Sequence, residues 1–300
     1  MKVAFSPIYR YDLLPVGHRF PMDKYDLLSE QLLREGTVDS IDFFHPEPLT
    51  EEQILRTHSS DYWDKLKHGT LSRKEIRAMG FPFHESLVWR GRHIANGTLQ
   101  CAYHAMQGGV SLNIAGGTHH AYADRGEGFC LFNDMAIAST ELLYRGDVSQ
   151  ILIIDLDVHQ GNGTAHIFQD EPRVFTFSMH GAHNYPLRKE QSDLDIGVPD
   201  GTGDATYLEI LSEQLPRLID TVTPDLIFYL SGVDVLKSDK LGRLGMSLQG
   251  CRERDRRVFE VAREAEIPVA VSMGGGYSER IRDIIEAHAN TFREAKRVFS

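Results

Sequence analysis

The sequence predicts an α/β fold: one domain with a central, mostly parallel β-sheet flanked by helices. Apolar, β-branched runs alternate with amphipathic stretches along the chain. Several of these runs are continuously apolar, as expected when helices cover both faces of a parallel sheet. No Ser- or Pro-rich linker, internal repeat or low-complexity tract divides the 300 residues. Nothing therefore marks a boundary between two domains.

The predicted elements alternate between strand and helix. The strand-like segments are residues 2–5, 110–114, 150–157, 173–178, 225–230 and 268–273. The helical stretches between them include residues 133–146, 204–222 and 252–266. Two capping boxes, Thr50 with Gln53 and Ser72 with Glu75, mark helix starts in the N-terminal third. The charge-rich run at 252–257 is interpreted as the solvated face of its helix.

The charge balance is acidic, with 32 Lys and Arg against 43 Asp and Glu and a net charge of −11. Nucleic acid is excluded as a general partner, because phosphate binding needs a basic surface. An acidic chain mildly favours cationic partners. No apolar run is long enough to cross a bilayer, so no membrane partner is expected.

Cysteine usage and the N-terminus predict a cytoplasmic protein. Cys101, Cys130 and Cys251 are too few and too scattered for a disulfide framework or paired metal ligands. The first ten residues hold a short apolar stretch without a cleavage-site pattern, which predicts a first strand and not a signal peptide.

Glycines gather just after four of the predicted strands. They are Gly116 and Gly117, Gly161 and Gly163, Gly232, and Gly274 to Gly276. In open α/β sheets, ligands bind outside the carboxyl ends of the strands, where glycine permits close backbone approach. Polar side chains stand beside the same glycines, namely His119, His120, Asp155, Asp157, His159, Asp234 and Tyr277. These strand ends are predicted to converge on one site.

Two segments supply candidate metal ligands. Asp155 and Asp157 are two apart in a strand and project to the same side, and a glycine-rich turn lets His159 fold back beside them. Asp234 ends another apolar strand. Two carboxylates and one imidazole suit zinc or another first-row metal and leave an open position for water. The alternative, acids that only cap the next helix, is disfavoured because acids on a buried strand need a charge partner.

The neighbouring His119 and His120 suit proton transfer to and from water. Asp155 and Asn162 are available to orient their ring nitrogens. Tyr277, after three glycines, can aim a phenol at a carbonyl oxygen as an oxyanion donor. A single histidine is more often structural and a single tyrosine more often packs in a core. The shared position at strand ends favours the chemical interpretation.

Five segments together resemble the successive signatures of zinc-dependent histone deacetylases. They are AGGTHHA (115–121), GEGFCLFND (126–134), DLDVHQGNGT (155–164), SGVDVLKSDKLGRLGMS (231–247) and GGGY (274–277). The compact length, HRFPMDKY (18–25) and the HQGNG turn are similar to the class IV branch and its bacterial relatives. The resemblance implies an arginase/deacetylase-like catalytic domain over residues 1–300, with three layers and about eight strands.

The resemblance also implies the bound ions. Zinc would be held by Asp157, His159 and Asp234. The family's monovalent-cation site uses backbone carbonyls beside Asp155, Asp157 and His159 together with a serine, which here is Ser178. Potassium is therefore expected at that place.

Catalytic roles follow from the same resemblance. His119 and His120 become the proton-transfer pair, and the second of them is usually given the role of general base in the family. Asp155 would hold His119. Asn162 stands where class I members have an Asp, as in class II and class IV members. Tyr277 becomes the group that polarises the acyl carbonyl.

The expected substrate is an acyl-lysine protein or peptide, or a small acylated amine. Phe129 matches one aromatic wall of the family's acyl-lysine tunnel and Tyr185 replaces the opposite wall, with Gly128 and Gly275 as further substrate-binding positions. The expected reaction is hydrolysis of the N-acyl amide by metal-activated water. Two alternatives remain: an amidohydrolase of acetylpolyamines or other small amides, and a non-catalytic acyl-lysine-binding protein.

Overall fold

A single eight-stranded sheet runs through the computed structural model, which describes all residues from Met1 to Ser300. The strand order is β2-β1-β3-β8-β7-β4-β5-β6, and every neighbouring pair is parallel. The strands are β1 (Lys2–Ala4), β2 (Phe43–Phe44), β3 (Val110–Asn113), β4 (Ile151–Asp155), β5 (Val174–Gly181), β6 (Leu194–Val198), β7 (Leu226–Leu230) and β8 (Val269–Ser272). The predicted α/β class with a parallel sheet is confirmed.

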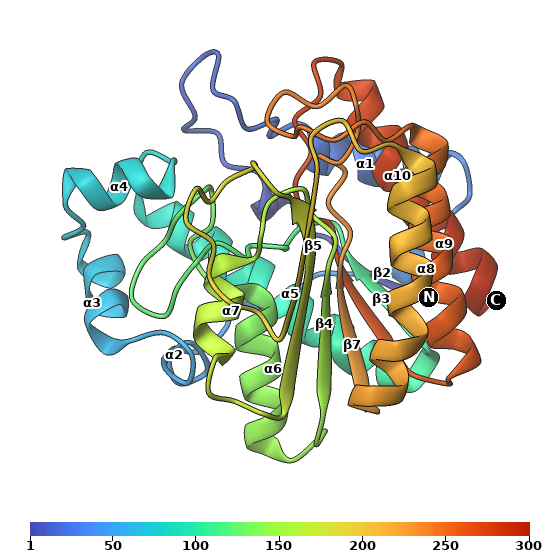
Figure 1. Cartoon of the computed structure of the whole chain (residues 1–300). Helices are drawn as coiled ribbons and strands as arrows, with labels where there is room; N and C mark the ends of the chain where they lie inside the picture. The colour runs from blue at the N-terminus through green and yellow to red at the C-terminus, as the bar shows by residue number, and fades with distance from the viewer.

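Helices cover both faces of the sheet (Figure 1). On one face α5 (Glu85–Gly108), α6 (Asp134–Arg145) and α7 (Asn162–Phe168) pack in a row. On the other lie α1 (Lys24–Arg34), α8 (Asp204–Val222), α9 (Leu248–Glu264) and α10 (Ile281–Phe299). Three short helices, α2 (Glu51–Leu55), α3 (Ser60–His68) and α4 (Arg73–Met79), lie outside the first layer.

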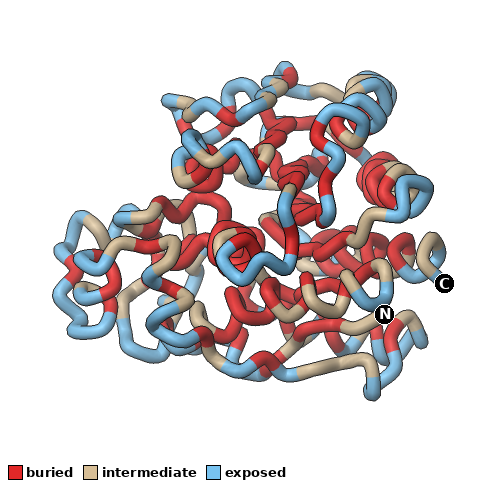
Figure 2. The backbone as a smooth tube through the Cα atoms, turned by 90° about the horizontal axis from the view of Figure 1, so that it is seen from below, coloured by how far each residue is buried: buried red, intermediate tan, exposed pale blue.

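The core explains why the central strands lack polar alternation. Every residue of β4 and β7 is buried, because α5 to α7 cover one face and α8 to α10 the other. The buried apolar residues form one continuous cluster of 79 side chains. In Figure 2 the buried segments run through the middle of the molecule and the exposed ones lie at its outline. No helix of the chain has both the length and the apolar character needed to span a bilayer.

Both predicted capping boxes are present. Thr50 and Gln53 bond reciprocally at the start of α2, and Ser72 and Glu75 do so at the start of α4. The two outer strands β2 and β6 had no counterpart among the predicted segments. β2 is only two residues long, and β6 alternates partly buried and exposed positions at the edge of the sheet.

The interpretation of residues 252–257 as a solvated face was wrong in part. Arg254 and Asp255 are fully buried and lie 2.8 Å apart as an ion pair. The physical reason is that α9 packs between α8 and α10, so only part of its surface reaches water. The Arg254 guanidinium also donates to the carbonyl oxygens of Leu156 and Gly232, which gives the buried charge polar partners.

Candidate active site

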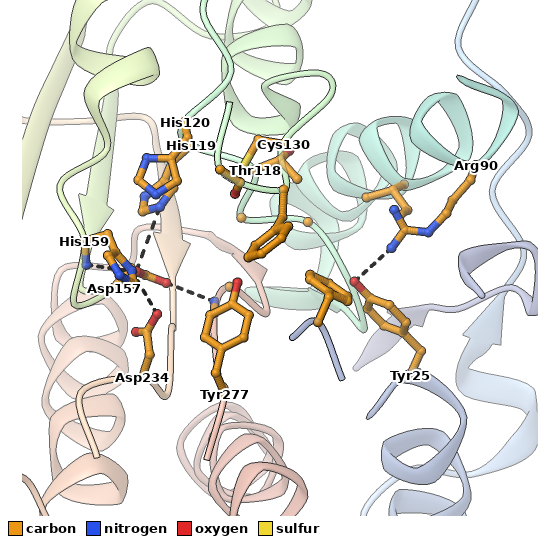
Figure 3. A pocket seen from close by; sticks show the side chains of 18 residues that line it. Tyr25, Arg90, Thr118, His119, His120, Cys130, Asp157, His159, Asp234 and Tyr277 are labelled. Carbon is orange, nitrogen blue, oxygen red and sulfur yellow. Dashed lines mark hydrogen bonds and ion pairs between the residues drawn. The ribbon is translucent and has the colours of Figure 1, made fainter. Parts of the chain in front are cut away.

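The order of the strands brings the predicted polar residues together. β3, β8, β7 and β4 are consecutive in the sheet, and all four run in the same direction. Their carboxyl ends therefore meet at one edge. Figure 3 shows the side chains that follow these strands gathered around one hollow.

Asp157, His159 and Asp234 form a cluster that can hold a metal ion. One ligand atom from each of them lies within 4.8 Å of the other two. His159 Nδ1 is 3.0 Å from Asp157 Oδ1 and 3.2 Å from Asp234 Oδ2. Asp234 is fully buried, and its Oδ2 makes no hydrogen bond. A buried carboxylate oxygen without a partner, facing an imidazole and a second carboxylate, fits a divalent cation.

Charge balance supports the same conclusion. Burial and the neighbouring Asp157 carboxylate raise the pKa of Asp234 to about 7. Burial alone would lower the pKa of His159, but the neighbouring carboxylates of Asp157 and Asp234 outweigh it and raise that pKa to about 10. The two carboxylates therefore need a proton or a cation close to them.

Hydrogen bonds from backbone N–H groups orient the carboxylates of Asp157 and Asp234. Asp157 Oδ2 accepts the N–H of Gly275 at 2.9 Å, and Asp234 Oδ1 accepts the N–H of Val158 at 3.0 Å. A Cβ atom on Gly275 would stand 2.2 Å from Asp234 Oδ2 and 2.8 Å from Asp157 Oδ2. Only glycine lets this loop come so close to both acids.

His119 and His120 stand side by side with different partners. Their ring centroids are 4.1 Å apart, and both side chains are buried. His119 Nδ1 lies 2.6 Å from Asp155 Oδ2, whereas His120 Nδ1 lies 2.6 Å from Asn162 Oδ1. These contacts use Nδ1 of both histidines, and both residues line the cavity.

The two histidines differ in protonation state. Burial alone would lower the pKa of His119, but the carboxylates of Asp155 and Asp157 raise it to about 9. Burial, together with the charges of His119 and His159, holds the pKa of His120 well below its usual range. At neutral pH the first imidazole is a cation and the second is neutral.

The Tyr277 hydroxyl points into the hollow from the side opposite the histidines (Figure 3). Its backbone N–H donates to Asp239 Oδ2 at 2.6 Å, and the other oxygen of Asp239 accepts the N–H groups of Leu241 and Gly242. Burial raises the pKa of the phenol well above its usual value, so the hydroxyl keeps its proton. One cavity is thus lined by a proton acceptor (His120), two proton donors (His119 and Tyr277) and the cluster that can bind a cation.

Comparisons with known proteins agree with this arrangement. The family described as "Histone deacetylase domain" matches residues 18–292. The protein belongs to the histone deacetylase family. A protein of Picosynechococcus described as uncharacterized is 42% identical over 99% of this chain and 100% of its own. Histone deacetylase 2 of Arabidopsis thaliana is 32% identical over 95% of this chain and 77% of its own.

Solved structures show the same fold. A histone deacetylase homolog from Aquifex aeolicus aligns with a TM-score of 0.84 at 24% identity, covering 98% of this chain and 83% of that chain. A homolog solved in complex with SAHA aligns equally well. The family contains hydrolases that act on amides, and this deacetylase-like protein is one of them.

Aromatic rings surround the entrance to the deacetylase-like site. The Phe129 ring lies 5.9 Å from that of Tyr277, and the Tyr185 ring stands perpendicular to that of His120 at 5.0 Å. Gly128 has a φ of +52°, and a Cβ there would come within 2.6 Å of the His120 ring. An outer hollow shares His120, Gly128, Phe129 and Tyr277 with the inner one, so the two adjoin, and Tyr185 lines the outer hollow alone.

Ser178, which the resemblance places beside a potassium ion, lies on β5 next to β4. It is the direct register partner of Asp155 across β5 and β4, and its hydroxyl lies 3.0 Å from His180 Nδ1. The three cysteines are free and buried, as expected, and Cys130 lines the inner hollow.

Sequence reasoning missed two buried cations beside the site. Lys24 donates to the carbonyl oxygen of Gly274 at 3.1 Å, and burial lowers its pKa to about 8. Arg90 lines the inner end of the hollow and donates to the Tyr25 hydroxyl at 3.0 Å (Figure 3). Both lie in helical segments far in sequence from the strand ends that carry the other site residues, so only the folded chain brings them to the site.

Proposed function

We propose that the protein is a zinc-dependent, class IV-like deacylase that hydrolyses the N-acyl amide of acyl-lysine in proteins or peptides. The unpartnered, buried Oδ2 of Asp234 beside Asp157 and His159 carries this proposal. Oxygen and nitrogen ligands without sulfur suit catalytic zinc. When bound, zinc would act as a Lewis acid toward the acyl carbonyl and lower the pKa of water to about 7.

The histidines divide the proton transfers. His120 is neutral, and Asn162 occupies its Nδ1, so its Nε2 accepts the proton of the attacking water. His119 is a cation held by Asp155, and it donates a proton to the leaving lysine amine. The Tyr277 hydroxyl donates a hydrogen bond to the carbonyl oxygen as negative charge develops there.

Aromatic walls support a lysine side chain as the substrate. Phe129 and Tyr185 both line the outer hollow and enclose its passage toward the site. The four methylenes of an acyl-lysine gain by leaving water for such a passage. Free, buried cysteines support placing the enzyme in the reducing cytoplasm, and potassium beside Ser178 would fix the neighbouring strand ends.

The test combines zinc analysis with turnover. We expect about one zinc per chain and measurable kcat/KM on peptides with acetyl-, butyryl-, octanoyl- or myristoyl-lysine. Asp157→Ala should lose zinc and nearly all turnover, whereas the exposed control Asp220→Ala should keep both. Tyr277→Phe should bind zinc normally and lose about 10²–10³ in kcat.

Three outcomes would contradict the proposal. Full activity of Asp157→Ala would remove the metal cluster from the chemistry. Zinc binding without turnover of any acylated amine would favour an acyl-lysine-binding protein. Faster turnover of acetylputrescine than of every acyl-lysine peptide would favour a small-amide amidohydrolase.

A further inference from the structure

The mouth of the outer hollow carries positive charge, although the whole chain has a net charge of −11. Arg19 and Arg243 both line this hollow and are exposed. Arg19 has no carboxylate partner. Arg243 Nη1 lies 3.4 Å from Asp200 Oδ2, with both side chains largely exposed, so water screens that pair.

Further cations stand next to lining residues. Arg77 precedes Ala78, Arg188 follows Leu187, and Lys240 precedes Leu241, and each of these lining residues faces the outer hollow. These three cations are exposed and form no ion pair. They are sequence neighbours of lining residues, whereas Arg19 and Arg243 line the hollow themselves.

The acids near the mouth are already engaged. Glu127 accepts hydrogen bonds from Arg125 at 2.8 Å and from the Tyr185 hydroxyl at 2.6 Å. Asp239 is occupied by backbone N–H groups, and Asp200 is shared between Arg243 and His183. The residues that line the outer hollow include two arginines and no Asp or Glu.

We propose that this mouth selects acylated lysines that have a carboxylate beside them and disfavours cationic substrates such as acylated polyamines. The inference rests on the proposed deacylase function and specifies its substrate class. A polyamine carries ammonium groups a few ångströms from its acylated nitrogen, where they meet Arg19 and Arg243. A peptide carboxylate at the same place is attracted. The net charge of the whole chain would have favoured the opposite substrate.

The size of the effect follows from exposed charge pairs. Each such pair changes an equilibrium by about two- to fivefold, so the two arginines together give about a tenfold preference. The preference must fall with salt, because the screening length shrinks from about 10 Å at 0.1 M to about 3 Å at 1 M.

The experiment compares kcat/KM for three otherwise identical acetyl-lysine peptides, with Glu, Gln or Lys on both sides of the modified residue. Free Nε-acetyl-lysine and acetylspermidine are measured alongside, which separates a flanking side-chain carboxylate from the α-carboxylate of the amino acid. We expect Glu to exceed Lys about tenfold at low salt and less than twofold at 1 M salt. Acetylspermidine should be the poorest substrate.

Variants assign the preference to residues. In the double variant Arg19→Ala/Arg243→Ala the Glu-to-Lys ratio should fall to about two, whereas Arg217→Ala, an exposed arginine on α8, should keep the wild-type ratio. Turnover of all peptides with equal rates, or an unchanged ratio in the double variant, would overturn the inference and leave the deacylase function standing. Absence of turnover on every substrate would instead refute that function.

Discussion

At the scale of single residues, the adjacent histidines His119 and His120 differ in the group that faces their Nδ1 atoms, a carboxylate for the first and a neutral amide for the second. Asp155 and Asn162 each place an oxygen 2.6 Å from a histidine Nδ1, but only Asp155 brings a charge. Asn162 also donates to the Tyr122 hydroxyl at 3.0 Å, which fixes its amide so that the oxygen faces His120. The neutral amide therefore orients His120 without stabilising its protonated form.

Replacing that amide by a carboxylate tests this assignment. In Asn162→Asp, the new charge favours the protonated imidazole, so His120 becomes a free base only at higher pH. The acid limb of the kcat/KM profile should move up by about one unit or more. The measurement is the pH dependence on an acetyl-lysine peptide. An acid limb that does not move would show that His120 is not the group titrating there.

Gly275 offers a second test at this scale. In Gly275→Ala the added methyl collides with the carboxylates of Asp157 and Asp234, so the ligands must move apart. We expect zinc affinity to fall by at least tenfold in a chelator competition. Gly108→Ala is the matched control, because a Cβ there has no atom within 4 Å. Equal zinc affinity in both variants would contradict the close approach.

Residue types and strand ends were enough to predict most of the site. The glycines and acids after β3, β4, β7 and β8 stand in the sequence beside apolar runs, so their convergence follows from a parallel sheet. Lys24 could not be found in this way. Its burial against Gly274 depends on how α1 docks across the chain, 250 residues apart in sequence.

At the scale of elements, α9 shows why charge alone misleads. The six charged residues at 252–257 were interpreted as solvent-facing, yet Arg254 reaches the carbonyls of Leu156 and Gly232 beside the site. Asp255 accepts hydrogen bonds from Arg254, Tyr229 and Thr291. These hydrogen bonds connect α9 to the ends of β4 and β7, which lead into the candidate metal ligands.

Breaking this pair should destabilise the protein strongly. Arg254→Met leaves the Asp255 carboxylate buried and uncompensated, at a cost of about 3–5 kcal/mol in the free energy of unfolding. Arg254→Met/Asp255→Asn should recover part of that loss, because no buried charge remains. Urea unfolding followed by circular dichroism measures both. The neighbouring Arg256→Met, at 42% side-chain exposure, is the control and should cost less than 1 kcal/mol. Equal losses in Arg254→Met and Arg256→Met would mean that burial does not set the cost.

The two edge strands, β2 and β6, could not be predicted from the hydrophobic pattern of the sequence. β6 pairs with β5 from Phe177↔Leu194 onward, but its side chains alternate between partly buried and exposed, and its sequence contains an acid and a glycine. Short edge strands gain their structure from a neighbour and not from their own composition. Their existence was implied only by the family resemblance.

At the scale of the whole molecule, one core joins the N-terminal third to the sheet. α5 contacts β1, β3 and β8, and the buried cluster continues from Val3 to Ala295 without a break. Trp63 on α3 and Trp89 on α5 are the two tryptophans, so fluorescence reports on the N-terminal third alone. Far-UV circular dichroism reports on the whole sheet and all its helices.

The two signals should therefore change in one transition. If residues 1–300 form a single domain, fluorescence and circular dichroism give the same midpoint in thermal unfolding. Zinc at about 100 times its Kd should add about 2.7 kcal/mol and raise both midpoints together, by about 4 °C for a chain of this length. Two separated midpoints, or a zinc shift seen only by circular dichroism, would show that the N-terminal third unfolds on its own. An equal rise in both midpoints would mean that a metal bound at the strand ends also stabilises helices that do not contact it. The reason is that a continuous core makes the whole chain unfold in one cooperative transition.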